Sequence, residues 1–259
     1  MQDRLQLAIE LARRAGGLLL EAPTLRISKK GATDLVTDYD LKSEQMLVKG
    51  ILEAYPEDGI LAEEGTNSQG IPAEVEHLWL IDPVDGTTNY AHGVPFYSVS
   101  IGLMANERLV FGVVYDPSRD ELFHASEGGG AWLNEQPLQV SETRTLEDSL
   151  LVTGFPYDIR TNPDNNLDHY SEFALRSRAV RRLGSAALEL AYVAAGRFEG
   201  YWELRLNPWD WAAGVLMVRE AGGVVTTFSG DDKVLDGDET LLATNGRIHQ
   251  EMMTTLGRI

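Results

Sequence analysis

The segment Trp79–Tyr90, WLIDPVDGTTNY, places two aspartates directly after an apolar strand and follows them with a glycine and two threonines. The apolar run Leu78–Ile81 is typical of a buried strand, and ionised carboxylates at the end of such a strand are costly unless they are paired. A bend at Pro83 would let Asp82 and Asp85 face the same side, where the two charges repel each other unless a cation lies between them. The fold must therefore end this strand where positive charge can reach it.

The first half of the chain predicts two amphipathic helices followed by a series of short strands. Apolar residues recur at helical spacing over Leu5–Leu19 and again over Val48–Tyr55. Short apolar runs predict strands at Ile60–Ala62, His77–Ile81, Ser98–Met104, Arg108–Tyr115 and Glu121–Ala125. Because turn signals at Ala105–Asn106 and Asp116–Ser118 separate the later runs, we expect these strands to form an antiparallel meander.

The second half alternates strands and helices instead, and the pattern changes near residues 140–148. Strands are predicted at Leu150–Thr153, Ala179–Leu183, Phe198–Trp202, Val224–Thr227 and Leu241–Thr244, and helices at Leu167–Arg176, Ser185–Ala195, Trp209–Ala221 and from Ile248 onward. Sheets covered by helices on their faces are the expected architecture, an α+β or α/β fold. We divide the chain into an N-terminal half, residues 1–143, and a C-terminal half, residues 144–259.

The charge of the chain limits its partners. With 40 acidic and 22 basic residues, the formal net charge is -18, which argues against nucleic acid or an anionic membrane as the main partner and favours cations. There is no cysteine, and the five histidines show no paired ligand spacing, so neither a thiolate site nor a zinc enzyme is predicted. No apolar run approaches the roughly 18 residues that a membrane helix needs. We expect a cytoplasmic protein with no membrane partner.

Acidic residues recur where predicted strands and helices begin or end. The group comprises Asp40 in LVTDYD, Glu63 and Glu64 after Ile60–Ala62, Asp82 and Asp85, and Asp210 in NPWDWAAG. Taken singly, Asp40 and Asp210 could be helix N-caps, and Asp85–Gly86 could be a simple turn. Taken together, carboxylates at several element ends, with no matching Lys or Arg nearby in sequence, are the hard oxygen ligands that Mg²⁺ prefers. We therefore predict a magnesium site.

The residues after Asp85 add a place for an anion. Gly86, Thr87 and Thr88 lead into a predicted helix, whose first backbone N–H groups are free to hold phosphate. For Thr88 a helix-capping role is an equal alternative. The Thr87 hydroxyl, beside the carboxylates, could orient a water for in-line attack on a phosphoryl group.

The motif DPVDGTTNY, with LAEEG before it and NPWDWAAG after it, resembles the inositol monophosphatase family of magnesium-dependent, lithium-sensitive phosphatases. The resemblance runs from LVTDYD through GSAALELAYVAAGRFEGYWE to VREAGG, which is essentially the whole chain. It implies a layered α/β/α/β/α sandwich like that of fructose-1,6-bisphosphatase and inositol monophosphatase. It also implies a homodimer, a small phosphorylated substrate, two or three Mg²⁺ ions per site and a reaction without a phosphoenzyme.

By the same resemblance, each matching position of this chain takes a role. The implied metal ligands are Glu63, Asp82, the carbonyl of Val84, Asp85 and Asp210, with Glu63 also holding a third, weaker ion through water. The implied catalytic residues are Asp40 and Thr87, which activate the water, together with Glu63. Gly86, Thr87 and Thr88 hold the phosphate, and Ser185, Ala186 and Glu203 line the inositol ring.

Arg205, in WELRLNPWD, departs from the family pattern, because many relatives have glycine at this position. One interpretation is a solvated arginine on a loop, which we favour. The other is a guanidinium that reaches inward and binds a distal phosphate, which would extend the substrates to fructose 1,6-bisphosphate. Glu203 would instead accept hydrogen bonds from a polyol and repel a second phosphate, so inositol 1-phosphate ranks first.

Other functions are open at the level of sequence. The family also includes phosphatases for fructose 1,6-bisphosphate, 3'-phosphoadenosine 5'-phosphate, histidinol phosphate and NADP. LVTDYDLK resembles the Asp-x-Asp motif of haloacid-dehalogenase-like phosphatases, although Lys42 replaces the usual Thr or Val and that class leaves Asp82, Asp85 and Asp210 unexplained. Some bacterial relatives are associated with RNA polymerase, so a regulatory binding role without catalysis is a further alternative.

Overall fold

The computed structural model describes residues 1–22, 24–29, 31, 35–65, 75–232, 234 and 240–257. Its helices are α1 Gln2–Leu20, α2 Asp38–Ala54, α3 Thr87–Ala91, α4 Leu167–Arg176, α5 Ala186–Ala194, α6 Pro208–Glu220 and α7 His249–Leu256. The strands of the first half are β1 Ile27–Lys29, β2 Leu35–Thr37, β3 Gly59–Ala62, β4 His77–Asp85, β5 Ser98–Ala105, β6 Arg108–Asp116, β7 Glu121–Ser126, β8 Gly130–Leu133 and β9 Gln136–Pro137. Those of the second half are β10 Leu150–Thr153, β11 Ala179–Arg181, β12 Gly200–Leu204, β13 Val224–Thr226 and β14 Thr240–Thr244.

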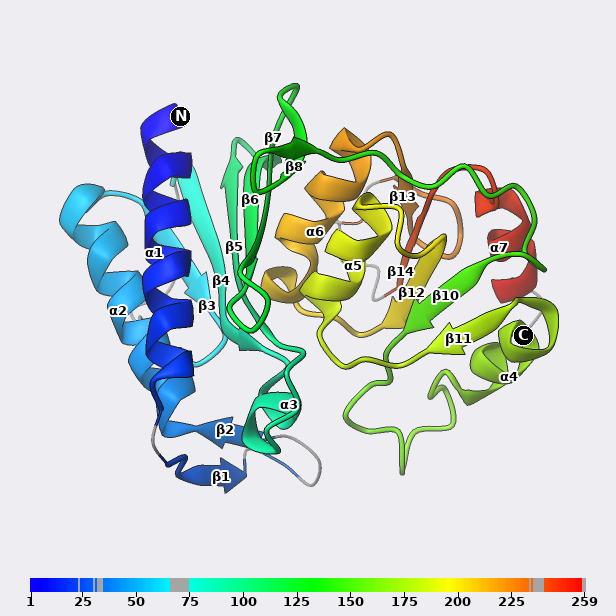
Figure 1. Ribbon diagram of the computed structural model, residues 1–259, viewed down its shortest axis with the longest axis horizontal. Coiled ribbons are helices and arrows are strands. Elements are labelled where there is room, and N and C mark those ends of the chain that lie inside the picture. The colour runs from blue at the N-terminus through cyan, green and yellow to red at the C-terminus, as the bar shows by residue number, and fades with distance from the viewer. Residues whose placement is uncertain are drawn as a thin grey trace.

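These elements stack in five layers, as Figure 1 shows from left to right. Helices α1 and α2 cover one face of a sheet with strand order β3-β4-β5-β6-β7-β8-β9, and α5 and α6 cover the other face. The second sheet, of order β11-β10-β12-β14-β13, lies on the far side of α5 and α6, and α4 and α7 form the outer layer beyond it. The predicted α/β/α/β/α sandwich is confirmed.

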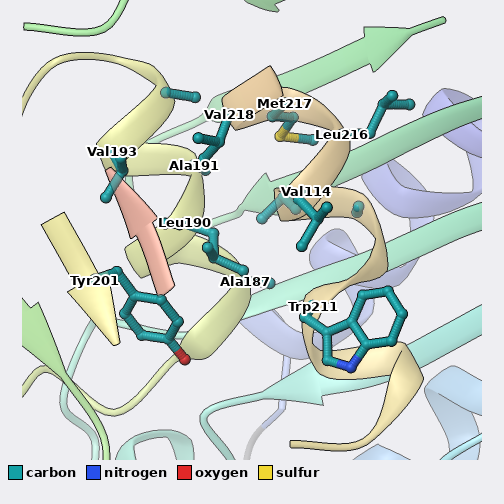
Figure 2. Close-up of a cluster of buried hydrophobic side chains, with 14 of the residues drawn as sticks. Val114, Ala187, Leu190, Ala191, Val193, Tyr201, Trp211, Leu216, Met217 and Val218 are labelled. Atoms are coloured by element: carbon teal, nitrogen blue, oxygen red, sulfur yellow. The ribbon is translucent and has the colours of Figure 1, made fainter. Parts of the chain in front are cut away.

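Each boundary between layers is a hydrophobic core, and neighbouring residues of one strand face different cores. In β4, Ile81 packs with the α1 and α2 side and Leu80 with the α5 and α6 side. In β12, Tyr201 belongs to the central core and Trp202 to the outer one. Figure 2 shows the central core, where side chains of α5 and α6 meet. This alternation follows from the two-residue period of a strand.

Helix α6 lies so deep between the sheets that Trp211–Val218 are buried without a break. A helix that is apolar on all sides is typical of this position. On the sheet below it, Gly102 of β5 pairs directly with Gly112 of β6. A Cβ on Gly112 would lie 2.5 Å from Ala213 Cα and 2.8 Å from the Ala213 carbonyl oxygen. The two glycines therefore let the backbone of α6 approach the sheet closely.

The strand predictions need three corrections. The expected meander holds from β4 onward, but β3 pairs parallel with β4, in the register Gly59 with Leu78. A parallel pair needs a crossover rather than a hairpin, and the long connection between Ala62 and His77 permits one. The short strands β1, β2, β8 and β9 were not predicted. Strand β12 begins at Gly200, two residues later than expected.

Helix α2 begins at Asp38, well before the predicted apolar stretch at Val48. Its first turns bury Asp40, Ser43 and Glu44 rather than apolar side chains. Apolar periodicity therefore fails in this part of the helix, although the chain is helical there. Buried polar groups at these positions indicate a role other than packing.

The division at residues 143 and 144 stays a prediction. Strands β3–β9 precede it and β10–β14 follow it, while α5 and α6 of the second half pack on the first sheet.

Within the described residues, no helix combines the length and the apolar character needed to span a bilayer.

We predict that Gly112→Ala destabilises the protein by about 1–3 kcal/mol, because the added methyl group overlaps the α6 backbone. The control is Gly17→Ala in α1, where an added Cβ would meet no other element within 4 Å. Since alanine favours a helix, this control should leave stability unchanged or raise it by up to about 1 kcal/mol. Urea unfolding midpoints measure both, and equal midpoints for the two variants would contradict the close approach of α6.

Candidate active site

A β-bulge brings Asp82 and Asp85 to one face of β4. Asp82 pairs with Ser100 and Asp85 with Ser98, so three steps along β4 match two steps along β5. Because alternate residues of β5 share a face, their two partners on β4 do too. Asp82 Oδ1 accepts a hydrogen bond of 2.9 Å from the backbone N–H of Val84, inside the bulge. The bend expected at Pro83 therefore exists.

Two further acids reach the same pocket from distant parts of the chain. Glu63 directly follows β3, and its N–H donates to the carbonyl of Ile81 over 3.1 Å. Asp210 lies in the first turn of α6, where its Oδ2 accepts 2.8 Å from the Asn207 N–H. Both line one pocket with Asp82 and Asp85. Asp210 is the N3 acid of a capping box rather than the N-cap considered from sequence.

The pKa values of Asp82, Asp85 and Asp210 reflect burial and mutual repulsion. Burial raises the pKa of Asp82 well above its usual range, and the charges of Glu63, Asp85 and Asp210 raise it further. Burial likewise raises the pKa of Asp210, with Asp85 as the next cause. The pKa of Asp85 rises only to about 6, because three hydrogen bonds from Ser185, Ala186 and Ala187 counteract its burial. The pocket therefore gathers negative charge that a bound cation would compensate.

Asp85 connects the two halves of the chain. Its carboxylate accepts 3.1 Å from the N–H of Ala186 and 2.8 Å from that of Ala187, the first two residues of α5. The Ser185 hydroxyl donates to the same carboxylate instead of capping its own helix. Ser185 and Ala186, the expected ring-binding residues, thus lie beside a predicted metal ligand.

Asp40 and Thr87 are in direct contact. Thr87 Oγ1 lies 2.9 Å from Asp40 Oδ1 and 3.0 Å from the Val84 carbonyl oxygen, so its hydroxyl can donate to either acceptor. Asp40 is fully buried at position N3 of α2, where its other oxygen accepts from the N–H and hydroxyl of Thr37. Burial raises the pKa of Asp40. Asp40 is therefore not an N-cap, since Thr37 has that role.

Gly86 is the N-cap of α3 and has a φ of 97°. A Cβ at this position would lie 3.0 Å from the Gly184 carbonyl oxygen and 3.1 Å from that of Phe96. Both the conformation and the close contacts therefore require glycine. Thr88 is exposed, lines the pocket and does not cap the helix, so the capping alternative for Thr88 is wrong.

Glu203, in β12, and Arg205, directly after this strand, also line the pocket. The hydroxyl of Tyr201 donates to Glu203 over 2.5 Å, and burial raises the pKa of Glu203 to about 7. Arg205 donates to the carbonyl and Oδ2 of Asp164, both at 2.8 Å, and to Asp158 over 3.4 Å. Its side chain is 24% exposed. Arg205 therefore lies on a loop and is partly exposed, and acids of a neighbouring loop bind its guanidinium.

Several supporting residues were missed from sequence. Ser43 donates to the Pro83 carbonyl over 3.2 Å and so fixes the bulge, and Glu44 accepts 2.7 Å from the Glu64 N–H next to Glu63. Glu189 accepts from the N–H groups of Leu183 and Gly184, which shapes the turn before Ser185. The available signal was the helical spacing of Asp40, Ser43 and Glu44, which places three polar groups on one face.

The residues of the pocket fit Mg²⁺ by donor type and by charge. Carboxylates and a backbone carbonyl are hard oxygen donors, and the hydrogen bonds described above for Asp82, Asp85 and Asp210 come from backbone N–H groups and a hydroxyl. In the described part of the chain, no three acidic or histidine side chains are already arranged to hold one ion. The acids therefore surround the pocket without forming a closed ligand shell.

The Asp-x-Asp alternative is not supported. Asp38 accepts 2.9 Å from the Arg26 N–H and 2.8 Å from Lys42 Nζ, while Asp40 turns to Thr37 and Thr87. The two carboxylates therefore serve different contacts and do not share a site.

The chain is similar to known proteins over nearly its whole length. The family model described as "Inositol monophosphatase family" matches residues 1–258. An inositol-1-monophosphatase of Synechocystis is 45% identical over 262 residues, covering 99% of this chain and 89% of the relative. The Nus factor SuhB of Pseudomonas aeruginosa is 42% identical over 264 residues, with 99% and 96% covered. The solved inositol monophosphatase of Anabaena has a TM-score of 0.89 at 43% identity, covering 100% and 96% of the chains. The chain therefore belongs to the inositol monophosphatase family.

Proposed function

We propose that the protein is a Mg²⁺-dependent phosphomonoesterase that hydrolyses inositol 1-phosphate to inositol and phosphate, with water as the nucleophile. The observation that carries this is the 2.9 Å hydrogen bond between Thr87 and Asp40 beside the acid-lined pocket. A water that donates to Thr87 Oγ1 can lose its proton while the threonine passes its own to Asp40. The raised pKa of Asp40, caused by burial, favours this transfer.

The acids of the pocket would hold the metal. Glu63, Asp82, Asp85, Asp210 and the Val84 carbonyl are the proposed ligands, and Glu63 also orients the attacking water. When bound, Mg²⁺ supplies a Lewis acid that neutralises charge on the phosphoryl and leaving oxygens. The first backbone N–H groups of α3, at Gly86, Thr87 and Thr88, would hold the phosphate. Two or three divalent ions offset the four carboxylate charges, so an anionic substrate can bind.

The substrate assignment rests on further residues that line the pocket. Ser185, Ala186 and Glu203 line the pocket, and Glu203 can accept hydrogen bonds from the hydroxyls of a polyol. The similar Synechocystis protein is named inositol-1-monophosphatase, which supports the same substrate here. A homodimer is proposed on family resemblance.

A regulatory binding role is a second candidate, because a relative 42% identical to this chain is named Nus factor SuhB. Catalysis and binding can be separated by a variant that lacks activity but folds. A pull-down from cells with such a variant would show whether a transcription partner binds independently of the site.

The first test of the proposal is phosphate release from five substrates. These are inositol 1-phosphate, fructose 1,6-bisphosphate, 3'-phosphoadenosine 5'-phosphate, histidinol phosphate and NADP. We expect Mg²⁺-dependent release with the highest kcat/KM for inositol 1-phosphate, because Glu203 disfavours a second phosphate. A higher value for another substrate would replace the assignment, and no release from any would favour the binding role.

Asp210→Asn should lower kcat/KM on the order of a thousandfold, because the charge of a metal ligand is lost. This decrease corresponds to a loss of several kcal/mol in transition-state stabilisation. The asparagine oxygen can still accept from the Asn207 N–H, so the start of α6 should remain folded. Asp168→Asn, in the first turn of α4, is the matched control and should retain activity. Near-normal turnover of a folded Asp210→Asn protein would count against the site.

Asp82→Asn should stabilise the metal-free protein while it abolishes activity. The raised pKa of Asp82 means that the folded state binds its proton more tightly than the unfolded state, whose pKa is about 3.9. Stability without metal should therefore fall as the pH rises above about 4, and the variant should lack part of this loss. Near pH 8 the Tm of the variant should therefore exceed that of wild type, and each 1 kcal/mol gained corresponds to about 2–4 °C.

Asp58→Asn is the control, because its effect on stability should have the opposite sign. Although burial acts to raise the pKa of Asp58, hydrogen bonds from Arg4 and Trp79 lower it. Its neutralisation should therefore destabilise the protein above pH 4. Thermal unfolding from pH 5 to 8 in a chelator measures both variants, and a lower Tm for Asp82→Asn at pH 8 would show that its charge is compensated within the fold.

A further inference from the structure

The loop of residues 154–166, between β10 and α4, forms one wall of the pocket. Its first residues, Gly154–Tyr157, line the pocket, and Tyr157 at the rim is 63% exposed. The two ends of the loop are held together by buried Asn166, whose side-chain amide nitrogen donates 2.6 Å to the Gly154 carbonyl. The Asn166 oxygen accepts 2.7 Å from Trp202 Nε1. The base of the loop is therefore anchored to the second sheet.

The body of the loop has turns of its own. The N–H groups of Thr161 and Asn162 donate to the Asp158 carbonyl over 2.9 and 3.0 Å, and Asp164 N–H donates to the Asn162 side chain over 3.0 Å. These contacts lie within the loop. They give it shape but do not fix its position relative to the pocket.

Arg205 connects the body of the loop to the end of β12, the strand that pairs with β10. It directly follows β12, and one nitrogen, Nη2, donates to both the carbonyl and the carboxylate of Asp164 at 2.8 Å. The other, Nη1, reaches Asp158 at 3.4 Å. A planar guanidinium can bridge several acceptors in this way, whereas an ammonium group has one centre of charge.

The backbone at Arg205 is in the left-handed region, with φ 59°. A residue with a Cβ adopts this conformation at a cost in free energy that glycine avoids. Such strain persists where surrounding contacts hold it. At Arg205 these contacts include the hydrogen bonds to Asp158 and Asp164 of the loop.

We propose that Arg205 is a positioning residue that selects substrates by size. By holding the loop through Asp158 and Asp164, it fixes Pro156 and Tyr157 at the rim, so the pocket admits a compact phosphorylated polyol and disfavours a bulky phosphate ester such as a nucleoside monophosphate. Its charge is engaged by two acids and does not read a second phosphate. This inference rests on the proposed phosphatase function.

The kinetic test compares wild type with Arg205→Gly and Arg205→Lys. Glycine accepts φ 59° without strain, so this variant removes the bridge and spares the backbone. The substrates are inositol 1-phosphate, adenosine 2'-monophosphate and fructose 1,6-bisphosphate, which separate size from charge. In Arg205→Gly we expect the kcat/KM of the nucleotide relative to inositol 1-phosphate to rise about fivefold, through KM rather than kcat. Lysine keeps the positive charge but lacks the two-pronged guanidinium. The kcat/KM ratio of Arg205→Lys should therefore lie between those of wild type and Arg205→Gly.

Arg178→Ala is the matched control, because Arg178 also binds an acid, Asp148, but does not line the pocket. Its substrate ratios should equal those of wild type. A selective loss on the bisphosphate in Arg205→Gly would show that Arg205 reads a distal phosphate and would overturn the proposal. An equal change on all three substrates would overturn it as well, since size selection would be absent.

Hydrogen exchange tests the bridge without any activity. The amides of Thr161 and Asn162 should exchange about fivefold faster in Arg205→Gly and in Asp164→Asn, and the double variant should show little further increase because the two residues act through one contact. Unchanged exchange in both single variants would refute the bridge. If wild type releases no phosphate from any substrate, the proposed function fails, while exchange still decides whether Arg205 positions the loop.

Discussion

Repulsion among the carboxylates that line one pocket is the constraint on which the rest of this structure depends. Glu63, Asp82, Asp85 and Asp210 line one pocket, although each charge raises the cost of its neighbours. The fold compensates in part by directing helix N-termini at the same place. Asp40 and Asp210 occupy first turns of α2 and α6, and Asp85 accepts from the first N–H groups of α5. The positive ends of several helix dipoles thus converge on the acids.

This arrangement requires both sheets to be in place. The bulge in β4 orients Asp82 and Asp85, but the hydrogen bonds that hold Asp85 come from the start of α5, a hundred residues later. Helix α6 brings Asp210 from the second half onto the first sheet. The central core between the sheets is therefore also the support of the site, and its packing determines how the acids lie relative to one another.

Sequence reasoning succeeded where local pattern and chemistry coincide. An apolar run followed by DPVD predicts a strand that ends in two acids on one side, and the register of β4 against β5 confirms it. It failed where tertiary contacts decide. The direction of β3 depends on its partner, and the start of α2 carries buried polar residues that break the apolar period. The pairing of Arg205 with Asp158 and Asp164 was not predicted, since these acids lie more than forty positions away in the sequence.

The glycine pair on β5 and β6 gives the molecule a mechanical link between packing and chemistry. Gly102 and Gly112 let α6 approach the sheet closely at Ala212 and Ala213, one turn after Asp210. We expect that a methyl group added at either glycine would displace α6 and with it the carboxylate of Asp210. Residues that do not contact the substrate would thus determine how the two halves of the site are aligned.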